Sequence, residues 1–182
     1  RENNDMHWNV GNGSKGPIRF MGQPSERQVA MRALIQRVKS ARVTVADELV
    51  SQISQGLLVF IGMMKNDTEA DLEWVVKKII HLRIFPDSQG RMKHGIQDIS
   101  GEILLVSQFT LCADLKKGSR PSFSDAMAPT EAKEHCATAA RALATHVPVQ
   151  QGRFGAMMDV ALVNDGPVTI WLDSKAGNGS KT

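Results

Sequence analysis

Three polar side chains that lie close together in the sequence are the first candidates for chemistry. Ser107, Gln108 and Thr110 fall within four positions of one another, at the end of the apolar run 104–106. An apolar run that follows a glycine, here Gly101, is typical of a buried strand. Polar groups at the end of a buried strand either bond to neighbouring backbone or take part in a reaction. This stretch is therefore a candidate site.

The hydroxyl groups of this stretch allow nucleophilic chemistry in principle. A serine or threonine oxygen forms an acyl intermediate when a neighbouring base activates it. No obvious general base stands within the stretch. We therefore expect Thr110 to position a substrate, and a nucleophilic Thr110 is the alternative. If the strand continues through residue 111, alternation places Gln108 and Thr110 on one face and Ser107 and Phe109 on the other.

A second stretch, residues 164–169, lies near the C-terminal end and contains Gly166 and Pro167. Glycine and proline that follow asparagine and aspartate are typical of a turn. Residues 159–163 and 168–172 have the composition of strands. We therefore expect a turn that joins two strands.

The composition predicts a packed protein rather than a disordered one. The chain has 182 residues, and 42% of them are hydrophobic, which suffices for one domain with a core. No apolar run is long enough to span a bilayer, and residues 1–30 lack the apolar stretch of a secretory signal. The two cysteines form neither a disulfide framework nor a metal-ligand spacing. We expect a cytoplasmic protein without a metal site.

The formal net charge of +3 does not indicate nucleic-acid binding by bulk charge. Lys116, Lys117 and Arg120 form a local basic patch directly after the first candidate site. Such a patch suits a protein that grasps only one end of an RNA molecule, and a solvated loop is the alternative.

Hydrophobic periodicity predicts an α+β fold with a largely antiparallel sheet. Apolar residues at 72, 75, 76, 79 and 80 have helical spacing and follow candidate caps at 66–68. Pro129 suits the first position of a second helix. Further strands are expected at 32–38, 41–46, 49–53, 57–63 and 147–150. Residues 1–30 and 176–182 read as low-complexity tails around one domain, 31–175.

Eight short motifs resemble, in order, those of the D-aminoacyl-tRNA deacylase family. They are the candidate stretches 107–111 and 164–169, together with residues 33–38, 42–45, 56–59, 83–85, 118–124 and 152–154. The resemblance extends over residues 31–173. It implies a homodimer with a two-sheet, barrel-like core and two main helices outside, working without a metal or organic cofactor.

The resemblance also implies a substrate and a way to select its handedness. The substrate is the ester that joins a D-amino acid to the 3′-terminal adenosine of tRNA. In the family the bond between Gly166 and Pro167 is cis, and the pair from one subunit enters the pocket of the other. Its carbonyls form a wall that excludes an L side chain. Arg37 matches an arginine that fixes this pair, although sequence alone equally allows a surface charge.

The same resemblance assigns the remaining site residues. Ser107, Gln108 and Thr110 are expected to carry the catalytic site, with nearby backbone N–H groups as oxyanion donors and the ribose 2′-hydroxyl helping to activate water. Phe109 is expected to stack on the terminal adenine or, alternatively, to pack in the core. Met127 and Ala128 are expected at the pocket rim.

Two other functions are compatible with the residues. One is a nucleic-acid-binding protein that has the same fold and does not hydrolyse esters. The other is a hydrolase of small esters. The retention of every motif residue favours the deacylase over the nucleic-acid-binding protein.

Overall fold

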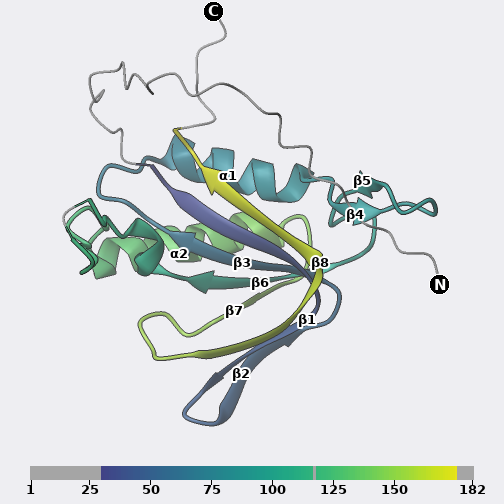
Figure 1. Ribbon diagram of the computed structural model, residues 1–182, viewed down its shortest axis with the longest axis horizontal. Helices are drawn as coiled ribbons and strands as arrows, with labels where there is room; N and C mark the ends of the chain where they lie inside the picture. Colours follow the sequence, from purple (N-terminus) through teal and green to yellow (C-terminus); the bar gives the residue numbers. More distant parts are fainter. Residues whose placement is uncertain (1–29, 117, 176–182) are drawn as a thin grey trace, which may run out of the picture.

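A computed structural model describes residues 30–116 and 118–175. The two expected tails therefore lie outside the described residues, apart from Ala30. The described chain forms a six-stranded sheet, a separate two-stranded ribbon, two α-helices and a short 3₁₀ helix (Figure 1). The expected α+β class is confirmed. None of the described helices is long and apolar enough to cross a membrane.

The elements follow one another along the chain with short connections, apart from residues 113–128. The strands of the large sheet are β1 (Arg32–Val45), β2 (Glu48–Ile53), β3 (Gly56–Gly62), β6 (Glu102–Ser107), β7 (Val149–Gln151) and β8 (Asp159–Asp173). The ribbon consists of β4 (Phe85–Pro86) and β5 (Met92–His94). The helices are α1 (Glu69–His81), the 3₁₀ helix η1 (Phe109–Cys112) and α2 (Pro129–Ala144).

The large sheet is mixed, with more antiparallel than parallel pairing. Its order is β2-β1-β3-β6-β7. Strands β3 and β2 pair with successive segments of β1, and β8 pairs with β1 along both segments on its opposite edge. The pairs that include β1 are antiparallel, whereas β3 with β6 and β6 with β7 are parallel. The sheet curves into a nearly closed, barrel-like form (Figure 1). The core strands make one continuous sheet, so the expected division into two sheets is not seen among them.

Strand β1 combines two strands that the sequence predicted separately. Its residues 32–38 pair with β3, and its residues 41–45 pair with β2. The strand bends between these two segments, as Figure 1 shows. The strands predicted at 41–46 and 49–53 form a hairpin. Ala46 and Asp47 form its turn with φ values of 49° and 64°, as a two-residue hairpin turn requires.

Both α-helices pack against the same face of the sheet. The predicted apolar stripe of α1 is buried and shares one core cluster with Cys136, Ala139, Ala140 and Leu143 of α2. Alternate residues of the central strands face this cluster, as Leu57 and Val59 do, whereas Leu58 faces a second cluster inside the curved sheet. Strand β3 is therefore buried on both faces, which explains its nearly continuous run of apolar residues.

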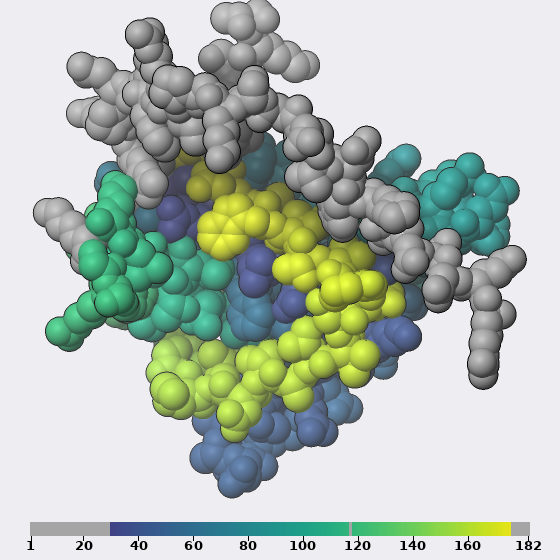
Figure 2. All heavy atoms as spheres, in the orientation of Figure 1, coloured from purple at the N-terminus to yellow at the C-terminus, as the bar shows by residue number. Residues whose placement is uncertain are grey.

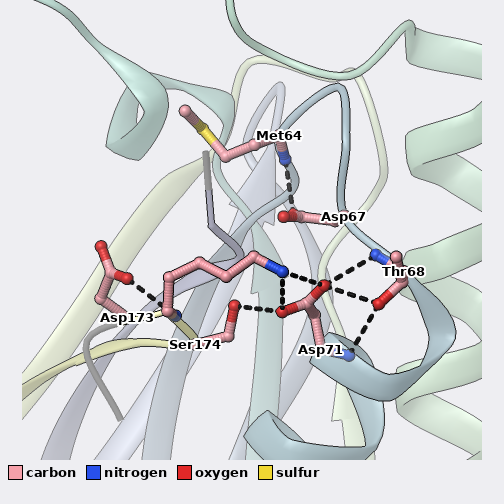
Figure 3. A network of polar contacts seen from close by, with 7 residues as sticks. Met64, Asp67, Thr68, Asp71, Asp173 and Ser174 are labelled. Atoms are coloured by element: carbon pink, nitrogen blue, oxygen red, sulfur yellow. Dashed lines mark hydrogen bonds and ion pairs between the residues drawn. The ribbon is translucent and has the colours of Figure 1, made fainter. Parts of the chain in front are cut away.

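A network of polar contacts fastens the end of β8 to the start of α1 (Figure 3). Thr68 caps α1 and donates a hydrogen bond of 2.7 Å to Asp71, which also accepts one of 2.7 Å from Ser174. The Lys175 ammonium lies 3.0 Å from the same carboxylate. Burial by itself raises the pKa of Asp71, but these hydrogen bonds and this ion pair outweigh it and hold the pKa well below its usual range.

A second carboxylate beside this network, that of Asp67, has too few hydrogen bonds to offset the effect of burial on its pKa. Asp67 is buried, and one of its oxygens accepts a hydrogen bond of 2.7 Å from the Met64 N–H while the other has no hydrogen-bond partner. Burial raises the pKa of Asp67 from 3.8 to about 6, and the nearby Asp71 charge adds to this shift. The folded protein therefore holds a proton on Asp67 more tightly than the unfolded chain does.

This difference predicts how stability changes with pH. A raised folded-state pKa gives stability that is complete below pH 3.8 and is lost as pH rises through about 6. The free energy of unfolding of the wild type, relative to that of Asp67→Asn, should fall by roughly 2 kcal/mol between pH 4 and pH 7. Urea unfolding across this range measures it, with the exposed Asp47→Asn variant as the control for removing one charge. A difference that does not change with pH would contradict the prediction.

Candidate active site at the end of β6

The predicted catalytic stretch lies where β6 ends and the chain turns into η1. The expected strand through residue 111 is wrong, because β6 ends at Ser107 and residues 109–112 form the 3₁₀ helix. Gly62 makes room for this turn. A β-carbon at Gly62 would lie 2.9 Å from the Gln108 carbonyl oxygen and 3.0 Å from the Leu111 β-carbon. The predicted alternation of faces beyond Ser107 therefore does not apply.

The turn presents its side chains at different depths. Ser107 and Gln108 are half-buried, whereas Thr110 is exposed. The Phe109 side chain is 57% exposed and contacts Phe123 edge to face, with ring centroids 5.0 Å apart. Phe109 is therefore not a core residue, which rules out the alternative for it. An exposed aromatic ring beside a polar strand end is suited to stack on a nucleobase.

Contacts to β3 and to the residues after it hold η1 in place. The Gln108 N–H donates to the Ile61 carbonyl at 2.8 Å, and the Cys112 thiol donates to the Met63 carbonyl at 3.3 Å. Burial raises the pKa of Cys112 to about 11, so this thiol stays protonated and serves as a donor rather than as a nucleophile. Cys112 therefore supports the turn, and we do not expect it to act as a nucleophile.

The two predicted rim residues lie next to each other but in different environments. Met127 is 5% exposed and packs in the core, and its N–H donates to the Met63 carbonyl at 3.0 Å. Ala128 is exposed and precedes the first residue of α2. The segment before α2 is thus fixed along the end of β3, with Ala128 rather than the Met127 side chain facing outward.

A cavity of about 120 Å³ adjoins the catalytic stretch through Ser107. Its other lining residues come from β6, from α2 and from the chain around the end of β7; they are Leu105, Lys133, Cys136, Ala137, Gln151, Gly152 and Phe154. Sequence reasoning did not assign these residues to the site, although residues 152–154 formed one of the recognised motifs. A larger hollow of about 360 Å³ lies between β1, β2 and β8 and includes none of the predicted site residues.

The second predicted stretch forms a bulge inside β8 rather than a turn between two strands. Asn164 pairs with Val38 and Thr169 pairs with Gln36, so the residues between them loop out opposite Arg37. Strand β8 continues on both sides along β1. The bond between Gly166 and Pro167 is cis, as the resemblance implied. Both residues are exposed.

Side chains of the motif hold the neck of this bulge closed. The Asn164 amide donates to the carbonyls of Arg37 and Val168 at 3.0 and 3.1 Å, and the Thr169 hydroxyl donates to the Asn164 side chain at 3.2 Å. Gly166 has a φ of 119°, and a β-carbon there would lie 2.8 Å from Val168. The bulge therefore requires glycine at this position.

Arg37 lies behind the bulge and is buried, so the alternative of a surface charge is ruled out. Its side chain is 10% exposed, and Nε lies 2.9 Å from the Asp165 carboxylate. Its Nη1 donates to the Ile84 carbonyl. The guanidinium thus reaches the bulge through the Asp165 carboxylate. It thereby joins the bulge to the segment that follows α1.

The structure does not bring the two predicted stretches together within one chain. In the sheet register Ser107 is level with Ile61 and Ala33, whereas the bulge lies opposite Arg37. This offset is about 13 Å along the strands, and three strand spacings add about 14 Å across the sheet. Figure 1 shows the same separation, with the bend of β8 at one end of the sheet and the loop after β6 at the other.

The fold is that of aminoacyl-tRNA deacylases. A solved structure described as a probable eukaryotic D-amino acid tRNA deacylase covers 80% of this chain, with all of its own length matched, at a TM-score of 0.67 and 18% identity. A second, the c-Myc DNA Unwinding Element Binding Protein, covers 78% of this chain and 97% of its own, at a TM-score of 0.74 and 41% identity.

The particular family follows from sequence comparison. The chain belongs to the D-Tyr-tRNA(Tyr) deacylase family, whose model matches residues 34–173. It is 55% identical over 145 residues to a D-aminoacyl-tRNA deacylase of Thermomicrobium roseum, covering 79% of this chain and 94% of the relative. It is 49% identical over 145 residues to a D-aminoacyl-tRNA deacylase of Nitratiruptor sp., covering 80% of this chain and 99% of the relative.

The position of Phe109 at the start of η1 allows a test of the backbone donors. The Phe109→Ala variant removes the ring and keeps the N–H, whereas Phe109→Pro removes both; proline is tolerated at a first helical position. We expect kcat of Phe109→Pro to be about 10²–10³-fold below that of Phe109→Ala, the typical cost of one oxyanion donor. Single-turnover deacylation of D-tyrosyl-tRNA measures both. Equal kcat values would exclude the Phe109 N–H as a donor.

Proposed function

We propose that the protein hydrolyses the ester bond of D-aminoacyl-tRNA and releases the free D-amino acid and intact tRNA. The observation that carries this proposal is the family membership together with the two D-aminoacyl-tRNA deacylase relatives at 55% and 49% identity. The activity is placed in the cytoplasm, where charged tRNA is used. The exposed polar turn at the end of β6 is the proposed reaction site.

The groups of this turn match the needs of ester hydrolysis. The transition state places negative charge on the ester oxygen, which preorganised donors stabilise. The first N–H groups of any helix have no acceptor inside it, and Phe109 and Thr110 occupy these positions in η1. We assign the oxyanion to these donors and the alignment of substrate to Ser107, Gln108 and the Thr110 hydroxyl. The ribose 2′-hydroxyl of the substrate helps to activate water.

The tRNA end is held by stacking and by charge. The exposed Phe109 ring offers a face for the terminal adenine. Lys116 and Arg120 are exposed in the loop that follows η1. Cationic side chains bind phosphates without reading sequence, which suits an enzyme that acts on many tRNAs by their common end.

We further propose that the working unit is a homodimer in which the bulge of one subunit completes the site of the other. The cavity beside Ser107 holds about 120 Å³, whereas pockets for small molecules usually hold about 300–1,000 Å³. The bulge of the same chain lies at the opposite end of the sheet. A partner subunit supplies the missing wall if the two chains meet through β8.

The outer face of β8 supports this arrangement. In the space-filling view the strand, in yellow-green to yellow, lies across the surface of the molecule (Figure 2). Val163 and Trp171 on β8 are 52% and 49% exposed, and Gly166 and Pro167 are exposed between them. Large apolar side chains exposed along one strand are typical of a protein–protein contact.

A backbone wall explains how one site selects handedness while accepting different side chains. The carbonyls of Gly166 and Pro167 from the partner subunit are placed where an L side chain would point. They contact features that all D-amino acids share, so specificity does not depend on the side chain. Arg37 and Asp165 hold this wall through their 2.9 Å ion pair.

A nucleic-acid-binding role without hydrolysis is the second candidate. It is supported by the likeness to the c-Myc DNA Unwinding Element Binding Protein, at 41% identity. The higher identity to the two named deacylases and the small net charge of +3 favour the enzyme. Hydrolysis and binding are separable by experiment.

The first test compares matched substrates. We expect D-tyrosyl-tRNA to be deacylated at least about 100-fold faster than L-tyrosyl-tRNA, because a clash with backbone discriminates more strongly than one added methylene in an apolar pocket. Release of labelled tyrosine measures both rates. Similar rates for the two enantiomers would refute the wall, and binding of nucleic acid without release of either amino acid would favour the second candidate.

The second test asks whether each site uses two chains. Phe109→Pro removes a proposed oxyanion donor from η1, and Gly166→Ala damages the bulge, because its methyl group would meet Val168 at 2.8 Å. Each homodimer should be nearly inactive. A mixed dimer, purified through two different tags, has one site without either lesion, so it should recover about half of the wild-type activity. Mixed dimers as inactive as their parents would show that each site is built from one chain.

A further inference from the structure

The first residue of β1, Arg32, reaches the far end of the proposed reaction site. Its Nη1 donates a hydrogen bond of 2.8 Å to the Leu111 carbonyl, across 79 positions of sequence. Leu111 lies near the end of η1, where a carbonyl can lack a donor from within the helix. Arg32 and the Gln108 N–H therefore hold η1 at its two ends, with Phe109 and Thr110 between them.

The Arg32 side chain is itself held on β8. It is 20% exposed, and its Nε lies 3.7 Å from the Asp173 carboxylate. Its guanidinium carbon lies 5.8 Å from the centre of the Trp171 ring, within the range of a cation–π contact. Arg32 and Asp173 are also partners in the register of β1 and β8. Contacts with a carboxylate, a ring and a carbonyl leave the planar guanidinium little freedom.

The position of Arg32 in the sheet explains why it can reach η1. On the other edge of β1 its partner is Gly62, the residue whose missing side chain lets η1 approach the end of β3. The arginine spans this gap and reaches the turn that covers it. The missing side chain of Gly62 lets η1 approach β3, and the hydrogen bond from Arg32 to the Leu111 carbonyl fixes the end of η1.

We propose that Arg32 is a positioning residue for the reaction: it holds the Leu111 carbonyl and thereby fixes the Phe109 and Thr110 backbone against the ester. It does not touch the substrate. This inference rests on the proposed placement of the oxyanion donors on η1. A displacement of about 1 Å in such donors is enough to slow a reaction by about 10²-fold, so the loss of one anchor should affect turnover before it affects binding.

The test uses two substitutions at Arg32 and one control. Arg32→Met fills the space without a donor, and Arg32→Lys keeps the charge without the planar fork. Arg42→Met removes an exposed arginine elsewhere on β1. For deacylation of D-tyrosyl-tRNA we expect kcat of Arg32→Met to fall about 10- to 100-fold with KM within about twofold, a smaller fall for Arg32→Lys, and wild-type values for Arg42→Met.

Thermal unfolding of each variant separates positioning from general stability. A wild-type kcat in Arg32→Met, or a loss confined to KM, would overturn the inference. If Arg32→Met does not fold, Arg32→Lys decides, and a wild-type kcat in that folded variant would overturn it. Failure of the underlying site is recognised independently, because Phe109→Pro would then turn over as fast as Phe109→Ala.

Discussion

Strand β1 forms hydrogen bonds along both of its edges, and this double pairing sets the positions of the three strands that pair with it. Its 14 residues pair with β8 on one edge and with β3 and then β2 on the other. Figure 1 shows that β1 bends between its segment paired with β3 and its segment paired with β2, and such bends accompany irregularities in strand register. One such irregularity appears in β8, opposite Arg37, where the chain loops out as the Gly166–Pro167 bulge. The bulge is thus tied to the curvature of the sheet.

Buried charges reinforce this arrangement where they are paired. Arg37 meets Asp165 and the Ile84 carbonyl, and Asp71 meets Lys175, Ser174 and Thr68. Removing one partner of a buried ion pair leaves an uncompensated buried charge. The free-energy cost of that charge exceeds the stability that the intact pair contributes. These contacts join β8 to α1 at one end and to the segment after α1 at the bulge. They fix the location of elements that are far apart in sequence.

Local signals predicted the elements well where one residue or one period decides the structure. The stripe of α1, the start of α2 at Pro129 and the β1–β2 turn at Asp47 depend on neighbours in sequence. The end of β6 does not depend on neighbours in sequence, because η1 forms where Gly62, on another strand, leaves room for it. The single strand β8 was missed for the same reason: only pairing with β1 on both sides of the bulge shows that the strand continues.

The site could be predicted only as far as its motifs. Ser107, Gln108 and Thr110 were predicted from one motif, whereas Lys133 and Ala137 reach the cavity only through the packing of α2. These cavity positions and the bulge lie on separate elements with separate supports. Substitutions along the exposed side of α2 can therefore alter the shape of the cavity while the bulge and its anchors stay unchanged.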